Sequence, residues 1–291
     1  MPKTNEIINK ARLSENVVRM DVYSPLIASK AKPGQFVILR IWERGERIPL
    51  TISKSDPESG ILTLIFQEVG KTTLQLGTLE VGNRILSLVG PLGHPTPIKN
   101  YGTVVIVAGG LGTAEMLPIA RACKDAGNYV ISIVGARRAD LLILVEEMSE
   151  LSDEIIITTD DGSRGRKGVV TEPLKELIEK GKVDFVITCG PVIMMKFVAQ
   201  ITKEKGIPTL ASLNPIMVDG TGMCGACRVS VGGETKFACV DGPDFDAHLV
   251  DFDELMMRQK MFSEFEANAL RKWLEENRER IPPEHPILKL T

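Results

Sequence analysis

The first hundred residues alternate short apolar runs with turns. Four runs are rich in β-branched, aromatic and leucine residues, and they occupy residues 17–23, 35–42, 61–66 and 84–89. Turn signals separate them, including Lys32-Pro33-Gly34 and the polar segment 56–60. Many short strands at this spacing predict a small antiparallel β-barrel over residues 1–100.

The pattern changes at Thr103, where continuous apolar runs begin to alternate with helical stretches. The runs occupy residues 103–108, 129–134, 154–159, 184–189 and 209–213. Continuous apolar runs are typical of parallel strands buried on both faces. Strands that alternate with helices predict a doubly wound parallel sheet over residues 101–213.

Two shorter regions follow the predicted sheet. Residues 214–258 are rich in Gly, Asp and Cys, and we expect a small separate domain there. Within residues 259–291, apolar side chains recur at helical spacing and predict a helix with one apolar face, which contacts another subunit or packs on its own chain. These side chains are Phe262, Phe265, Ala269, Leu270 and Trp273. The fold class is therefore multidomain, β plus α/β.

Composition narrows the function classes. The chain has 291 residues and a net charge of -3, and its pI is near 5.8. A nucleic-acid binder would normally present a basic stripe or domain, so no nucleic acid is expected as a partner. No run approaches the ~20 apolar residues of a membrane span, and residues 1–6 lack the apolar region of a secretion signal. We expect a cytoplasmic protein without a membrane partner.

Three of the five cysteines crowd together behind an aspartate, in the order Asp219-x4-Cys224-x2-Cys227-x11-Cys239. This register is that of plant-type ferredoxins, C-x4-C-x2-C…C, with Asp219 in place of the first cysteine. The sequence predicts an iron–sulfur cluster held by Cys224, Cys227, Cys239 and, as the fourth ligand, Asp219.

Two alternatives to this ligand set stay open at this point. Asp241 or a water molecule could compete with Asp219 for the fourth position. A zinc site is the other alternative, although zinc would want a fourth Cys or His and only His248 lies close in sequence. Nearby glycines favour the cluster, because they let the backbone approach the inorganic sulfides. They are Gly220, Gly222, Gly225, Gly232 and Gly233.

Three loops at strand ends indicate a nucleotide site. One glycine-rich loop follows a buried strand and opens a helix, where backbone amides can meet a pyrophosphate; by itself it could equally be a tight turn. Two more loops fall at the same carboxyl edge of the predicted sheet, the edge where ligands bind in such folds. The three loops contain Gly109, Gly110, Gly112 and Thr113; Asp160, Asp161 and Gly162; and Cys189, Gly190 and Pro191.

Two segments of the predicted barrel are candidates for a phosphate-bearing cofactor. Arg47 provides a fixed cation beside a backbone stiffened by Pro49. The turn Gly70-Lys71-Thr72-Thr73 has a point charge beside two hydroxyls. Taken alone, each segment could be an ordinary surface arginine or a plain turn.

Together these motifs resemble the ferredoxin–NADP reductase superfamily over essentially the whole chain. Within it, the chain resembles the electron-transfer subunits of class B dihydroorotate dehydrogenases. It is still more similar to the small subunits of the NADH-dependent ferredoxin:NADP oxidoreductases, the flavin-based electron-bifurcating enzymes also called sulfide dehydrogenases. The family's Arg-x-Tyr-Ser/Thr flavin motif corresponds to residues 47–51, with Leu50 in place of the aromatic residue. At Asp219 the dihydroorotate family has Cys, and there the chain is similar to the bifurcating enzymes.

The resemblance implies a role for each motif. Arg47 would meet the FAD pyrophosphate, and Leu50 and Thr51, beside Pro49, would lie against the isoalloxazine ring. The remaining matches are Gly70, Lys71, Thr72 and Thr73 to a second FAD phosphate segment, Gly109, Gly110 and Gly112 to the pyridine-nucleotide loop, Asp160, Asp161 and Gly162 to the adenosine segment, and Cys189, Gly190 and Pro191 to the loop that faces the nicotinamide.

The implied function is an electron relay from NAD(H) through FAD to a [2Fe–2S] cluster, with no side-chain acid or base required. The implied partners are a larger subunit with its own FAD and [4Fe–4S] clusters, and ferredoxin reached through that complex. Two rival functions are a dihydroorotate dehydrogenase subunit and a non-enzymatic redox or zinc-binding regulatory module. Asp160 and Asp161 favour NAD(H), because carboxylates would repel the 2'-phosphate of NADP(H). Arginines that could instead accept it are Arg137, Arg138, Arg164 and Arg166.

Overall fold

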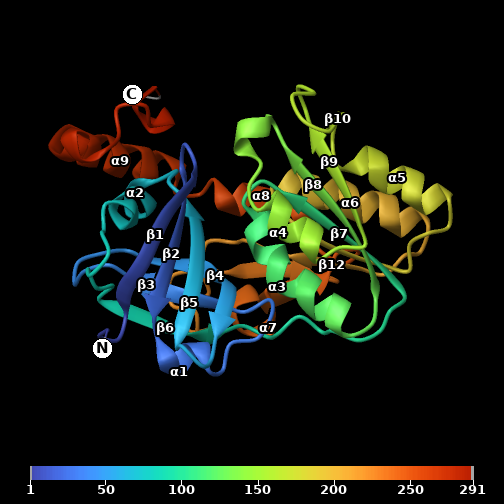
Figure 1. The fold of residues 1–291 in the computed structure, drawn as a ribbon, viewed down its shortest axis with the longest axis horizontal. Coiled ribbons are helices and arrows are strands. Elements are labelled where there is room, and N and C mark those ends of the chain that lie inside the picture. Colours follow the sequence, from blue (N-terminus) through green and yellow to red (C-terminus); the bar gives the residue numbers. More distant parts are fainter. Residues whose placement is uncertain (1, 290–291) are drawn as a thin grey trace.

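A six-stranded antiparallel sheet forms the N-terminal part of the protein, for which a computed structural model describes residues 2–289 (Figure 1). The strand order is β1-β2-β5-β4-β3-β6. The elements are β1 (Glu6–Ser14), β2 (Val17–Tyr23), α1 (Pro25–Ala28), β3 (Phe36–Arg40), β4 (Arg47–Asp56), β5 (Ile61–Gln67), α2 (Lys71–Gly77) and β6 (Ser87–Leu92). On the core face, Val18 and Met20 of β2 lie opposite Phe66 and Leu64 of β5, and all four are buried. Period-2 alternation therefore places the barrel core.

The second sheet has helices on both faces and the order β10-β9-β8-β7-β11-β12-β15. Its elements up to residue 212 are β7 (Thr103–Gly109), α3 (Gly112–Asp125), β8 (Tyr129–Ala136), η1 (Ala139–Leu141), α4 (Val145–Glu150), β9 (Glu154–Thr159), β10 (Arg166–Lys167), α5 (Thr171–Glu179), β11 (Phe185–Cys189), α6 (Val192–Glu204) and β12 (Thr209–Ser212). Helices α3 and α4 pack on one face, and α5 and α6 pack on the other. The strand order reverses between β7 and β11, as in doubly wound folds.

The cysteine-rich region packs against both sheets. It contains β13 (Arg228–Val231), β14 (Glu234–Phe237), α7 (Ala238–Asp241), β15 (Asp244–Asp246) and α8 (Phe252–Gln259). β15 pairs antiparallel with β12 and so extends the parallel sheet. One apolar cluster joins Phe36 and Ile38 of the barrel to Met195 of α6 and to Cys227 and Cys239. The region expected as a separate small domain thus shares its core with the other two.

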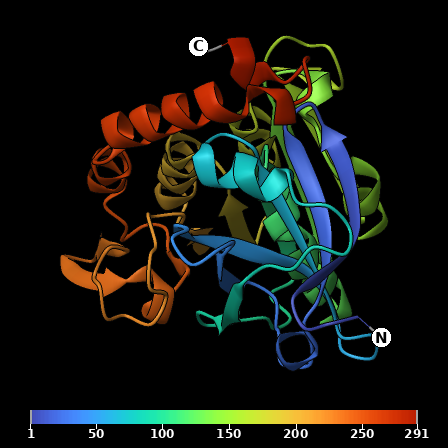
Figure 2. The same cartoon turned by 90° about the vertical axis from the view of Figure 1, so that its left-hand side faces the viewer.

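The C-terminal residues form α9 (Ser263–Asn277) and two short turns of helix, η2 (Arg278–Arg280) and η3 (Pro286–Lys289). Figure 2 shows α9 lying across α2 of the barrel. Trp273 and Leu274 are buried there with Leu74 of α2, whereas Phe265 is 74% exposed. The predicted apolar face is therefore only partly used within this chain.

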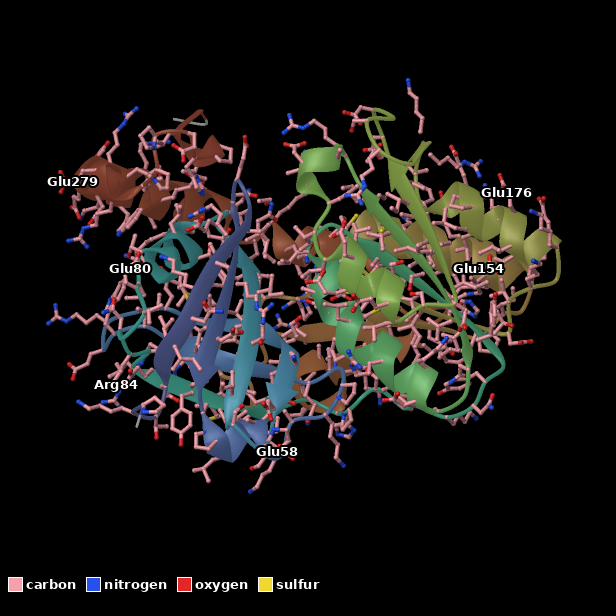
Figure 3. All side chains as sticks on the ribbon, viewed as in Figure 1. Glu58, Glu80, Arg84, Glu154, Glu176 and Glu279 are labelled. Atoms are coloured by element: carbon pink, nitrogen blue, oxygen red, sulfur yellow. The ribbon has the colours of Figure 1, made fainter. Side chains whose placement is uncertain are left out.

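Charged side chains cover the outside of the molecule. Glu58, Glu154 and Glu176 are among those that project from its periphery (Figure 3). In the described part of the chain, no helix has both the length and the apolar character needed to cross a bilayer.

Candidate functional site at the junction of barrel, sheet and cysteine loop

Two of the predicted nucleotide loops meet where the strand order of the parallel sheet reverses. A Cβ on Gly112 would lie 2.3 Å from the carbonyl oxygen of Cys189, and one on Gly190 would lie 3.1 Å from the Cα of Gly109. Pro191 is equally close, 3.0 Å from a Cβ on Gly109. The glycines are required here because two backbones are in contact at the carboxyl edge of β7 and β11, the edge where ligands bind in sheets of this kind.

The third predicted loop lies further along the same edge, after β9. Gly162 has a φ of +80°, so the turn favours glycine. The Asp161 carboxylate accepts hydrogen bonds from the amide and hydroxyl of Ser163, at 2.9 and 2.6 Å. The pKa of Asp161 is lowered by these bonds, so Asp160 and Asp161 present an exposed acidic turn.

Thr113 is placed differently from its loop neighbours. Its side chain is fully buried, and its hydroxyl has no hydrogen-bond partner within residues 2–289. Its amide donates to the carbonyl of Gly110 at 3.2 Å. Thr113 therefore shapes the turn, and Gly110, with a φ of +54°, is the member with open space above it.

The flavin-motif strand β4 presents its residues in alternating directions. The Arg47 side chain is half-exposed at the start of the strand. Pro49 is paired with Ile38 of β3, and Leu50 packs in the barrel core with 9% of its surface exposed. Leu50 therefore offers little surface to a flavin ring. Thr51 faces the other way, and its hydroxyl donates to Glu115 of α3.

The second phosphate segment is organised around one carboxylate. The Thr73 hydroxyl accepts from the amides of Gly70 and Val69, at 3.1 and 3.2 Å. Lys71 Nζ lies 3.2 Å from Glu46 Oε1, and the Thr72 hydroxyl donates to the other oxygen of Glu46. The Glu46 oxygens stand in for the phosphate oxygens that such a turn would bind, so the segment fits an anionic group of that kind.

A partly buried acidic cluster, which was not predicted from the sequence, lies between the barrel and the parallel sheet. Cys189 Sγ donates to Glu115 Oε2, and Thr96 of the barrel donates to Asp244 of β15. Burial raises the pKa of Glu115, and the bonds from Cys189 and Thr51 offset this only in part. Burial, followed by the nearby Glu115, also raises the pKa of Cys189 well above its usual value. The signal for this cluster in the sequence is Glu115, a charged residue within the apolar stretch of α3.

The cysteine loop gathers two thiols. Cys227 Sγ and Cys239 Sγ lie 3.2 Å apart, and the Cys239 amide is 3.5 Å from Cys227 Sγ. Burial and then Cys227 raise the pKa of Cys239 to about 12, while an amide bond from Gly222 lowers it. Cys224 is exposed on the same loop.

Asp219 lies between this loop and the barrel. Its carboxylate accepts from the Thr221 hydroxyl and, at 3.0 Å, from the Thr221 amide. Its other oxygen is 4.0 Å from Arg47 Nη1, and the Thr221 bonds lower the pKa of Asp219. A Cβ on Gly220 would lie 2.6 Å from Ile38 of β3, so the loop packs directly on the barrel.

Comparison with known proteins places the chain in one family. It is 49% identical over 270 residues to a Thermotoga maritima protein named as a homolog of the dihydroorotate dehydrogenase B electron-transfer subunit, covering 93% of this chain and 95% of that one. It is 33% identical to the corresponding Clostridium perfringens subunit, covering 84% and 98%. The chain belongs to the dihydroorotate dehydrogenase B electron-transfer subunit family.

A solved structure similar to this family member comes from a study of an NADH-dependent reduced ferredoxin-NADP oxidoreductase and its flavin-based electron bifurcation. The two chains share 48% identity and a TM-score of 0.90, over 94% of this chain and 99% of that one. This confirms the expected ferredoxin-reductase-like fold, with a barrel, a parallel nucleotide-binding sheet and a C-terminal cluster region.

Two segments of this chain match the models of known domain families. Residues 106–200 match an oxidoreductase NAD-binding domain, and residues 214–251 match the iron–sulfur cluster binding domain of dihydroorotate dehydrogenase B. The chain is therefore an oxidoreductase electron-transfer subunit. The prediction of FAD, an iron–sulfur cluster and NAD(H) as cofactors agrees with these matches and with the fold.

The residues present fit a cluster, although the ligand set is not closed. The Cys227–Cys239 pair and the Gly222 amide aimed at it form the thiolate environment that iron–sulfur sites use. Among residues 2–289, however, no three His, Cys, Asp or Glu side chains converge closely enough to hold a metal ion. The assignment of Asp219, Cys224, Cys227 and Cys239 as ligands therefore stays a prediction.

Proposed function

We propose that this chain passes electrons from NADH through FAD to a [2Fe–2S] cluster and on to a larger subunit, in a complex that performs flavin-based electron bifurcation with ferredoxin and NADP. The bound flavin would supply the exchange between two-electron and one-electron chemistry. The chain supplies binding, orientation and exclusion of water around it.

One observation carries this proposal. The flavin-motif strand, the nicotinamide loop and the cysteine loop lie next to one another, because Thr51 donates to Glu115, Glu115 accepts from Cys189, and Arg47 faces Asp219. Electron exchange requires this proximity of cofactors. The choice of the bifurcating complex rests on the similarity of the whole chain to the solved structure named above.

We propose the following roles for the binding residues. Arg47, Lys71 and Thr72 bind the FAD phosphates, Thr51 orients the flavin, and the loops after β7 and β11 hold the pyridine nucleotide. Cys224, Cys227, Cys239 and Asp219 hold the cluster. Asp219 lies close to Arg47, so the cluster loop borders the flavin strand.

NAD(H) is favoured over NADP(H) by the pairing of the nearby arginines. Arg138 binds Asp140 through two bonds of 3.1 and 2.7 Å. Arg164 Nη2 lies 3.1 Å from Glu146 Oε1, and Arg166 lies 2.7 Å from Glu176. Three of the four candidate arginines are therefore engaged with carboxylates, and the acidic turn at Asp160 and Asp161 would repel a 2'-phosphate.

The proposed partner is a larger flavoprotein subunit with its own FAD and [4Fe–4S] clusters. Relatives of this chain are named as electron-transfer subunits, which implies a catalytic partner. The stretch that would meet it is apolar and exposed, with Met257 at 69%, Met261 at 50%, Phe262 at 44% and Phe265 at 74%. Exposed apolar side chains that gather in this way mark interaction sites.

The decisive experiment is anaerobic titration of the purified chain with NADH and with NADPH. NADH should bleach the flavin absorbance and produce the EPR signal of a reduced two-iron cluster, and NADPH should act poorly. A colourless chain that binds zinc would instead identify a regulatory module, and bleaching by NADPH alone would reverse the nucleotide assignment.

A second candidate function is a dihydroorotate dehydrogenase electron-transfer subunit. It is favoured by the name of the Thermotoga relative and by the match over residues 214–251. The two functions differ in their partner, so the native complex separates them. NADH oxidation linked to orotate would favour this candidate, and NADH-dependent exchange between ferredoxin and NADP would favour the first.

A further inference from the structure

The C-terminal residues 263–289, here called the strap, are tied to one barrel helix. The apolar side chains of Trp273, Leu274, Ile281 and Ile287 are buried around Leu74 of α2. α2 contains Lys71 and Thr72, the residues proposed to bind an FAD phosphate. The strap thus covers this helix at Leu74, one turn beyond the proposed phosphate contacts.

A buried polar contact also joins the strap to the segment that leads into α2. His285 and Glu68 are 1% and 4% exposed, and His285 Nε2 lies 3.1 Å from Glu68 Oε2. The Ile287 amide donates to His285 Nδ1 at 3.2 Å. Because Nδ1 accepts, Nε2 bears the proton and donates to Glu68. Arg12 of β1 completes the site at 2.6 Å from the same Glu68 oxygen.

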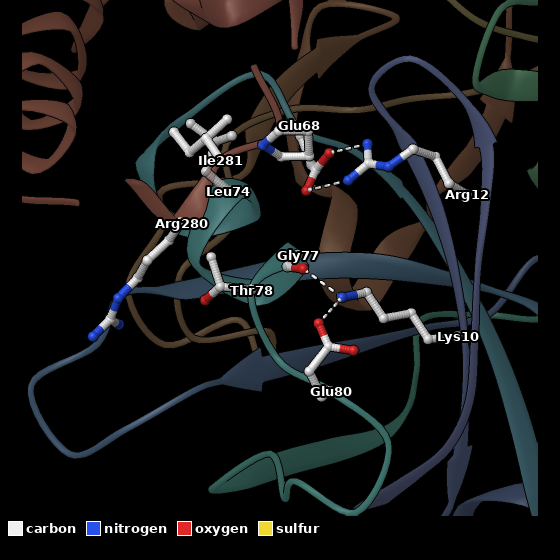
Figure 4. A pocket seen from close by; sticks show the side chains of 10 residues that line it. Lys10, Arg12, Glu68, Leu74, Gly77, Thr78, Glu80, Arg280 and Ile281 are labelled. Carbon is white, nitrogen blue, oxygen red and sulfur yellow. Dashed lines mark hydrogen bonds and ion pairs between the residues drawn. The ribbon is translucent and has the colours of Figure 1, made fainter. Parts of the chain in front are cut away.

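Glu68 in turn fixes the other end of α2. A Cβ on Gly77, the last residue of the helix, would lie 1.8 Å from Glu68 Oε1, so only glycine permits this approach. Lys10 Nζ donates to the Gly77 carbonyl at 2.8 Å. Figure 4 shows the bond from Lys10 to Gly77 and the Arg12–Glu68 pair beside a cavity of about 280 Å³ between β1, α2 and the strap. A substitution at Glu68 would therefore affect the position of the whole of α2.

We propose that the strap positions α2 for FAD, with His285 and Trp273 as positioning residues that do not touch the cofactor. The inference rests on the proposed function, because it takes Lys71 and Thr72 as FAD phosphate ligands. Without the strap, α2 would sample other positions. The FAD affinity would then be lower in proportion to the fraction of molecules in which α2 is placed to bind FAD.

The test compares variants of the full-length chain for FAD binding by titration of the flavin-free protein. His285→Leu removes the buried donor to Glu68 and should raise the FAD dissociation constant about tenfold, as expected when a buried charged acceptor loses one partner. His285→Gln retains an N–H donor and should restore most of the affinity. Glu275→Ala, on the exposed side of α9, is the matched control and should bind FAD like wild type.

A second measurement uses the unmodified protein. Coupling between two sites is reciprocal, so a strap that favours FAD binding must itself be stabilised by FAD. Addition of FAD should slow amide hydrogen exchange in residues 263–289 as well as in α2, and leave β13 and β14 unchanged. This measurement decides the question even if a variant does not fold.

Three outcomes overturn the inference. The first is wild-type FAD affinity in His285→Leu, and the second is failure of His285→Gln to restore a lost affinity. The third is a rate of amide hydrogen exchange in the strap that does not change when FAD is added. A general loss of structure would also lower the cluster absorbance of His285→Leu, whereas loss of positioning leaves it intact. If the wild-type chain itself binds no FAD, the proposed function fails instead.

Discussion

Individual residues at the junction owe their chemistry to burial. Glu115 is a partly buried carboxyl group, and its hydrogen bonds from Thr51 and Cys189 only partly replace the lost hydration. Asp244 is a second partly buried carboxyl group, with a pKa likewise raised by burial. Buried carboxyls of this kind tend to keep a proton at a pH where exposed ones have lost it. They also make folding depend on pH.

We expect Glu115→Gln to be more stable than wild type at pH 8 and to lose this advantage toward pH 4. The folded pKa of Glu115 is raised above its ordinary 4.5. Between these two values the native state holds a proton that the unfolded chain has released, so stability falls as pH rises, by about 1.4 kcal/mol per unit of pKa difference. Glutamine does not titrate, so the stability of Glu115→Gln lacks this dependence on pH.

Denaturant unfolding of the flavin-free proteins from pH 4 to pH 8 would measure the effect. The charge of Asp244 contributes to the raised pKa of Glu115, so the same comparison in an Asp244→Asn background separates the two carboxyl groups. A stability difference that does not vary with pH would contradict the prediction.

Asp219→Cys tests the least ordinary of the predicted ligands. If Asp219 binds iron, an all-cysteine cluster should form, with altered visible absorption, g values and reduction potential, because an oxygen ligand and a thiolate differ in electron donation. Thr221→Val is the control, because it removes the hydroxyl that donates to Asp219 and leaves the carboxylate itself in place. An unchanged cluster spectrum in Asp219→Cys would identify Asp241 or water as the fourth ligand.

At the scale of elements, the strands with clear periodicity could be predicted from the sequence. The runs at 17–23 and 154–159 coincide with β2 and β9, and the runs at 103–108 and 129–134 lie within β7 and β8. Buried strands have uninterrupted apolar residues because both faces are covered, so their signal is local. The alternation of these strands with helices was sufficient to predict the doubly wound sheet.

Elements without such a local signal could not be predicted. β1 is largely polar because it lies at one end of the sheet order and only part of it is buried. β15 has three residues, and its pairing with β12 depends on tertiary contact. The same reason applies to the site, because the loop motifs are contiguous in sequence whereas the partners Thr51, Glu115, Cys189 and Asp244 meet only after folding.

The α2 turn permits a prediction about charge. Glu46 holds Lys71 and Thr72, so an incoming phosphate must displace a like charge. Glu46→Gln should tighten FAD binding by about 1.4- to fivefold, the range expected from an exposed ion pair worth about 0.2–1 kcal/mol. It should also make FAD binding more sensitive to salt, because Glu46 would no longer neutralise Lys71. Glu43→Gln in the same loop is the matched control, because its side chain is exposed. Weaker FAD binding in Glu46→Gln would instead show that Glu46 positions Lys71.

At the scale of the whole molecule, the cysteine region joins the two sheets. β15 extends the parallel sheet, and Gly220 packs on barrel strand β3. One apolar cluster therefore joins the three parts of the chain that carry the candidate cofactor sites. This packing keeps the sites close together, and the exit of electrons then depends on how the partner docks.

The last prediction concerns the docking of the larger subunit on α9. Phe265 is 74% exposed on α9, whereas Trp273 on the same helix is buried against this chain, so substitution of Phe265 leaves the strap packing intact. A charge at the centre of an apolar interface typically costs about 2 kcal/mol or more. Phe265→Glu should therefore weaken co-purification of the larger subunit by more than tenfold. Bleaching of the flavin by NADH in the isolated chain should not change. Glu266→Gln on the same turn is the control, and full recovery of the complex with Phe265→Glu would exclude this surface.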